Sequence, residues 1–128
     1  IPNTTRLENY LNNFYKVVFA RPADEAGYHF HLNQLKNKQI SLRKFLLNML
    51  SEKEFIERYK TTESKVEALY NGIFFRTSDW EGKLFWIDEY KKAVQLYGSE
   101  SQALYKTVDR IINEKELKEL AEQMNVLW

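Results

Sequence analysis

Metal binding or acid–base catalysis would require histidines, cysteines or carboxylates at matched spacings, and this chain offers few candidates. Its two histidines, His29 and His31, are two residues apart. On a helix they would point about 200° apart, so they cannot share a metal as an i, i+4 pair can. Cysteine is absent, which removes thiol chemistry and Cys-type zinc sites. We therefore predict no catalytic residue, no metal site and no cofactor.

Glutamates are numerous, and they alternate with lysines as on solvated helix faces. Two groups stand out: Glu52, Glu54, Glu57 and Glu63, and then Glu114, Glu116, Glu119 and Glu122. A glycosidase needs two carboxylates on opposite walls of a cleft, and helix-borne glutamates could supply them. A glycan-active hydrolase therefore remains the alternative to a function without catalysis.

One aromatic residue is better suited to binding than to packing. Trp80 follows Asp79, at a position where the other half of the chain has the charged residue Glu25. A residue in the first turn of a helix there should face solvent, so Trp80 is a candidate anchor for a sugar or a protein partner. The alternative is that its ring folds back over the preceding corner.

A nine-residue stretch contains four cations and no acid: Lys36, Lys38, Arg43 and Lys44. It is typical of a solvated loop and helix start, and otherwise could be a weak docking patch for an anionic cell-wall polymer.

The whole chain has 19 basic and 18 acidic residues, so it lacks the strongly basic footprint that binds nucleic acid. No apolar run approaches the roughly 20 residues that span a bilayer.

The elements that position these residues follow from an internal repeat. Six residues recur without gaps after 55 positions: Tyr15, Phe19, Arg21, Asp24, Gly27 and Phe30 become Tyr70, Phe74, Arg76, Asp79, Gly82 and Phe85. Ser51-Glu-Lys-Glu54-Phe55 is echoed 62 residues later from Asn113. The second unit thus contains seven extra residues, most simply a two-turn helix extension near residues 91–97. A fixed period of this kind indicates a repeated structural unit.

Apolar residues recur at helical spacing nearly throughout, which predicts an all-α fold. Capping boxes at Thr5–Glu8 and Ser51–Glu54, and caps at Asp24 and Ser41, predict four helix starts in the first half. In the second half we expect helices over 66–75, 79–97 and 101–112, with Gly98 as a stop. The prediction is one helical domain, residues 1–128, built from two similar multi-helix units at about 7–60 and 62–120 around a shared aromatic core.

The repeated Arg-x-x-Asp-x-x-Gly lies at the corner between the first two helices of each unit. Asp24 and Asp79 suit helix N-caps, and Arg21 and Arg76 could donate to free carbonyls or to the aspartate. Gly27 and Gly82 would allow a close approach of the two helices. A ligand or metal site at this corner is the alternative, but capping and packing explain every repeated position. His31 occupies the position of Trp86 and is interpreted as a packing residue.

The repeated signature, followed by Ser/Asn-Glu-Lys-Glu-Phe/Leu, resembles the domain of unknown function 4214 family, and related helical units occur in phycobilisome linker proteins. The resemblance covers roughly residues 7–60 and 62–120. It implies a helical module, usually part of larger exported or surface-associated bacterial proteins, and no catalytic residue. The chain departs from the family at His31, where Trp is usual, and at Thr77, which replaces the proline seen as Pro22. We therefore expect an interaction or assembly module, outside the cell or on its surface, with a protein or carbohydrate partner.

Overall fold

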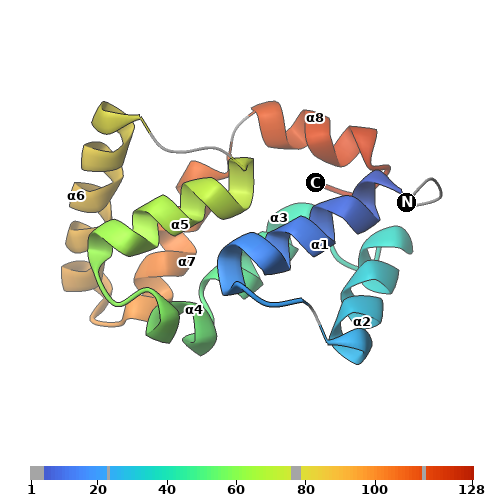
Figure 1. The fold of residues 1–128 in the computed structure, drawn as a ribbon. Helices are drawn as coiled ribbons and strands as arrows, with labels where there is room; N and C mark the ends of the chain where they lie inside the picture. Colours follow the sequence, from blue (N-terminus) through green and yellow to red (C-terminus); the bar gives the residue numbers. More distant parts are fainter. Residues whose placement is uncertain (1–4, 23, 76–78, 114) are drawn as a thin grey trace.

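The chain folds into α-helices joined by short connections. The structure is a computed structural model that describes residues 5–22, 24–75, 79–113 and 115–128. Within these residues there are eight α-helices and no strand (Figure 1). The predicted all-α class is confirmed.

The first half contains α1 (Arg6–Phe19), α2 (Glu25–Lys36), α3 (Leu42–Leu50) and α4 (Lys53–Arg58). The capping box at Thr5 is present, since Thr5 and Glu8 each satisfy the other's backbone N–H. Asp24 caps α2 and Ser41 caps α3 through their side chains. These three predicted helix starts are confirmed, because each depends only on residues within one turn.

The second half contains α5 (Thr62–Phe74), α6 (Trp80–Tyr97), α7 (Glu100–Ile111) and α8 (Lys115–Gln123). Helix α6 has 18 residues where α2 has 12, which matches the predicted extension. It ends at Gly98, whose φ of +68° is the left-handed conformation that glycine adopts most easily. Helix α5 begins earlier than predicted, because Thr61 and Ser64 form a capping box that the sequence analysis missed.

The predicted capping box at Ser51 is wrong. The Ser51 hydroxyl donates to the Leu47 carbonyl at 2.7 Å and so closes the end of α3. Helix α4 starts after Glu52, without a side-chain cap. The Glu54 carboxylate, expected to complete the box, instead binds the guanidinium of Arg21. A charge-assisted bidentate pair is stronger than a single bond to a backbone N–H.

Helices at equivalent positions in the two halves lie against each other. Helix α1 packs on α5 and α3 packs on α7, while α2 and α6 lie at opposite edges (Figure 1). One buried cluster contains Phe14 and Phe45 from the first half together with Leu69 and Leu104 from the second. This arrangement supports a shared core. That neither half folds alone stays a prediction.

The contact between α1 and α5 is close at one point. A Cβ added to Gly72 would lie 2.3 Å from Cγ2 of Val18, well inside van der Waals contact. The equivalent position in the first half is Val17, which is exposed. The glycine of α5 therefore sets the distance between the two halves.

A buried lysine fixes α6 against its neighbours. Lys65 of α5 is only 1% exposed, and its Nζ lies 3.4 Å from the Glu100 carboxylate at the start of α7. The same carboxylate accepts the hydroxyl of Tyr90, the buried residue of α6, at 3.1 Å. One carboxylate thus joins α5, α6 and α7, and this determines which face of α6 points outward.

Candidate functional site

Helix α6 exposes more apolar surface than its neighbours. It packs mainly against α5 and α7 at one edge of the molecule, and Tyr90 is its buried residue (Figure 1). Five large apolar side chains are 40–76% exposed along its length: Trp80, Leu84, Phe85, Leu96 and Tyr97. Exposed large apolar side chains that gather on one element are typical of a site of interaction. The outward face of α6 is therefore the candidate functional site.

Trp80 is the most exposed aromatic residue described, at 73%. Its position follows from the cap, since the Asp79 carboxylate accepts the N–H of Gly82 at 2.6 Å and begins the helix at Trp80. The first residue of α6 then projects into solvent. The prediction that Trp80 faces solvent is confirmed, and the alternative that it folds back over the corner is wrong.

The other exposed apolar residues of α6 were missed from the sequence. Phe85 and its repeat equivalent Phe30 were recognised from the sequence only as repeated positions, and the two are 51% and 57% exposed. At 100° per residue, Phe85 lies about 140° from the buried side of α6 marked by Tyr90. Helical stripes alone did not reveal this, because α6 has apolar residues on most sides.

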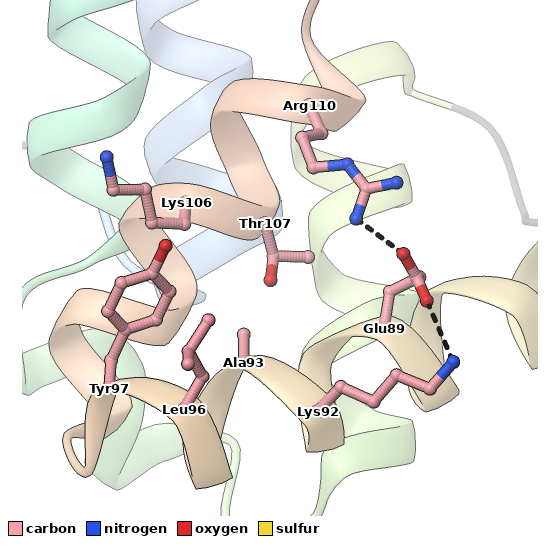
Figure 2. A pocket seen from close by; sticks show the side chains of 8 residues that line it. All are labelled: Glu89, Lys92, Ala93, Leu96, Tyr97, Lys106, Thr107 and Arg110. Atoms are coloured by element: carbon pink, nitrogen blue, oxygen red, sulfur yellow. Dashed lines mark hydrogen bonds and ion pairs between the residues drawn. The ribbon is translucent and has the colours of Figure 1, made fainter.

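A shallow groove lies between α6 and α7 at the far end from Trp80. It has a volume of about 190 Å³ and is lined by Glu89, Lys92, Ala93, Leu96, Tyr97, Lys106, Thr107 and Arg110. Figure 2 shows Leu96 and Tyr97 on the α6 wall opposite Lys106 and Thr107 on the α7 wall. The groove therefore combines an aromatic ring with several cations.

Two of the cations in the groove contact the carboxylate of Glu89. Arg110 donates to the Glu89 carboxylate, and Lys92 Nζ lies 3.5 Å from its other oxygen (Figure 2). The hydrogen bond from Arg110 is the main reason that the pKa of Glu89 falls below its ordinary value. The guanidinium also lies 5.2 Å from the ring of Trp86. These contacts hold α6 against α7.

The repeated corner serves the fold in the first half. Asp24 accepts the N–H of Gly27 at 2.7 Å, as predicted for a cap. Arg21 does not pair with Asp24. It donates to both oxygens of Glu54, at 3.0 and 2.9 Å, and to the Pro22 carbonyl at 3.3 Å. Arg21 thereby ties the corner to α4, a contact 33 residues away that local sequence could not indicate.

The close approach of two helices that was predicted at the corner glycines is found at one of them. A Cβ on Gly27 would lie 3.1 Å from the capping carboxylate of Asp24, so the crowding comes from the cap. At Gly82 a Cβ would meet Asp79 at 3.0 Å and the hydroxyl of Tyr70 in α5 at 3.1 Å. The predicted approach of the preceding helix is thus found only at Gly82. Arg76 and Thr77, the remaining predicted positions here, lie outside the described residues.

The basic stretch does not form a free cationic patch. Arg43 pairs with Asp109 of α7, Lys44 donates to the Tyr105 hydroxyl at 2.9 Å, and Lys38 donates to the Asn125 carbonyl at 2.8 Å. Three of the four cations thus connect the halves of the chain. Lys36 is exposed at the end of α2. Docking of an anionic polymer on this stretch loses its main support.

His31 lies among aromatic rings. Its imidazole is 5.2 Å from the ring of Phe45 and 6.4 Å from that of Tyr15. Its Nδ1 is buried without a hydrogen-bond partner in the part of the chain that the structure describes. Burial is the main reason that the pKa of His31 falls below its ordinary value. These contacts agree with the packing role inferred from sequence.

No group of three or more His, Cys, Asp or Glu residues among the described residues has the arrangement of a metal site. Over the same ranges, no helix has both the length and the apolar character required to cross a membrane.

The chain is similar to one family of known proteins over part of its length. The family model described as Domain of unknown function (DUF4214) matches residues 3–59, the region of the first predicted unit. No curated protein matches the chain.

Proposed function

We propose that the chain, whose residues 3–59 match the DUF4214 family model, is a non-catalytic interaction module that binds carbohydrate through the exposed face of α6. As the resemblance implies, it would act within a larger bacterial protein that is secreted or held at the cell surface. The observation that carries the proposal is the 73% exposure of Trp80.

The contacts around Trp80 support binding by stacking. The cap at Asp79 and the hydrogen bond of Tyr90 to Glu100 both tie down the backbone of α6, so we expect the indole to bind a ligand with little ordering of the backbone. Leu84, one turn further along α6, is 48% exposed and extends the apolar surface. An indole offers a broad apolar face with a polar N–H at its edge, which suits a ligand that has apolar faces and polar rims. A pyranose ring has this character.

The experiment is a glycan array probed with the wild-type chain, Trp80→Ala and Phe30→Ala. Phe30 is the matched control, because it is an aromatic residue with 57% exposure on α2, the equivalent helix of the first unit. We expect wild type and Phe30→Ala to bind the same glycans, and Trp80→Ala to lose at least about tenfold in affinity, or 1.4 kcal/mol. An array with no bound glycan, or equal binding by Trp80→Ala, would contradict the proposal.

The alternative of a glycan-active hydrolase has less support from geometry. The groove between the end of α5 and α8 contains two carboxylates, Glu116 and Glu119, but both belong to α8 and so to one wall. Glycoside hydrolysis uses carboxylates on opposite sides of the scissile bond. Release of reducing ends from any glycan bound on the array would favour the hydrolase.

A further inference from the structure

The outward side of α6 carries a continuous stripe of exposed residues. Leu84, Asp88, Lys92 and Leu96 follow one another at four-residue spacing, and Phe85 lies beside Leu84. Residues four apart are neighbours on one helix face. Leu84, Phe85 and Leu96 are 48%, 51% and 76% exposed, and the Asp88 and Lys92 side chains are 65% and 68% exposed. The stripe is apolar at both ends and charged at its centre.

We propose that this stripe binds a second copy of the chain, with the two α6 helices antiparallel and related by a twofold axis that passes outside α6 at the height of Tyr90. Leu84 and Leu96 are each six residues from Tyr90, and Asp88 and Lys92 are each two residues from it. In a twofold antiparallel pair, residues equidistant from the axis face each other. Leu84 and Phe85 of one copy then meet Leu96 of the other, while Asp88 faces Lys92.

The charges make the surface complementary to itself. Within one copy, Lys92 Nζ lies 3.0 Å from the Asp88 carboxylate, so the centre of the stripe is neutral. In the pair, two aspartates and two lysines would alternate around the axis, and each charge would gain an opposite neighbour from the other copy. A surface with this balance attracts its own copy and has no excess charge to recruit a strongly acidic or basic partner.

The area available sets the expected strength. The exposed parts of the apolar side chains in the stripe sum to the order of 300 Å², within the range of the largest apolar patch on a typical monomer. With the polar residues between them, each copy would bury on the order of 500 Å², or about 1,000 Å² in total, which is the size of weak and transient interfaces. The dimer should therefore form at protein concentrations between about 0.01 and 1 mM.

The proposal rests on the proposed function only in treating the outward side of α6 as a binding surface. Trp80 is ten residues before Tyr90, so it would face position 100 of the other copy, beyond the end of α6 at Tyr97. It would lie at the rim of the pair, open to a sugar. Loss of the dimer and loss of glycan binding are therefore separate outcomes, tested by different variants.

The test is sedimentation equilibrium of the wild type, Asp88→Lys, and Asp88→Lys with Lys92→Asp. We expect the wild type to form a dimer, the single variant to be at least tenfold weaker because four cations would meet at the axis, and the double variant to recover the dimer. Glu57→Lys is the matched control, since Lys53 and Glu57 form an exposed i, i+4 pair on α4. It should associate as the wild type does.

Thermal melts establish that each variant is folded before its association is compared. A wild type that stays monomeric up to about 1 mM would overturn the proposal. Equal association by the single charge reversal would also overturn it, as would a double variant that remains as weak as the single one. The glycan array bears on none of these outcomes.

Discussion

The substitution Gly72→Ala tests how closely the two halves of the chain are packed. In an ordinary helix interior, replacing glycine with alanine stabilises by about 1 kcal/mol, because alanine loses less backbone entropy on folding. Here the added Cβ would lie 2.3 Å from Cγ2 of Val18, across the contact between α1 and α5. The two effects therefore oppose each other.

The steric effect should prevail. Restoring an ordinary contact would require a shift of more than about 1 Å, and valine is stiff at χ1, so its methyl group cannot rotate away without cost. Overpacking of a well-packed core costs about 1–3 kcal/mol. After the gain in helix propensity, we expect a net destabilisation of up to about 2 kcal/mol, or a fall in Tm of up to roughly 10 °C for a domain of this size.

Thermal and urea denaturation of four proteins checks this reasoning: the wild type, Gly72→Ala, Val18→Ala and the double variant. Removing the Val18 methyl groups makes room for the new Cβ, so the double variant should be more stable than the sum of the single effects predicts, by about 0.5–3 kcal/mol. Val17→Ala is the control for Val18→Ala, because Val17 is the neighbouring valine of α1 and is exposed; it should change the free energy of unfolding by less than about 0.5 kcal/mol. A higher Tm for Gly72→Ala, or strict additivity in the cycle, would refute a tight contact between the halves.

Three further predictions concern stability. Asp24→Ala and Asp79→Ala each remove a helix cap, so each should lower the free energy of unfolding by about 1 kcal/mol, which a thermal melt would show as a fall in Tm of several degrees. An unchanged Tm together with loss of ligand binding would instead indicate a ligand site. Glu100→Ala leaves the buried ammonium of Lys65 without its carboxylate, at a cost on the order of 3 kcal/mol in the free energy of unfolding. In urea denaturation it should therefore be less stable than Lys65→Met. The reverse order would contradict the role given to this ion pair. Burial lowers the pKa of His31 in the folded state, so the unfolded state binds more protons just below pH 6.5 and the stability should fall as the pH drops through that value. The variant His31→Phe should flatten this part of a plot of Tm against pH. An unchanged plot would contradict the burial of a neutral His31.

The helix boundaries that could be predicted from the sequence are those fixed by neighbouring residues. Thr5, Asp24, Ser41 and Asp79 each cap a helix through a side chain three residues from its partner, and Gly98 ends α6 by its own conformation. The same reasoning failed at Ser51, because Glu54 is bound by Arg21 from a distant part of the chain. Local patterns carry no information about such partners.

The candidate site could be predicted only in part for the same reason. Trp80 was identified because its position in the repeat is polar in the other unit. The exposure of Phe85 and Leu96 depends on which side of α6 meets α5 and α7, and that is decided by the contacts of Lys65, Glu100 and Tyr90. Likewise, the sequence could not show that Arg43 and Lys44 of the basic stretch contact α7, and these contacts leave them unavailable as a free cationic patch.

The central claim, that binding occurs on the exposed face of α6, can be tested by fluorine NMR. The chain has three tryptophans, at positions 80, 86 and 128, so labelling with 5-fluorotryptophan gives three signals, and Trp80→Phe identifies the one from α6. During titration with the glycan that gives the strongest array signal, we expect the Trp80 resonance to shift and saturate while those of Trp86 and Trp128 stay in place. A Trp80 resonance that does not move at saturating glycan would contradict the account.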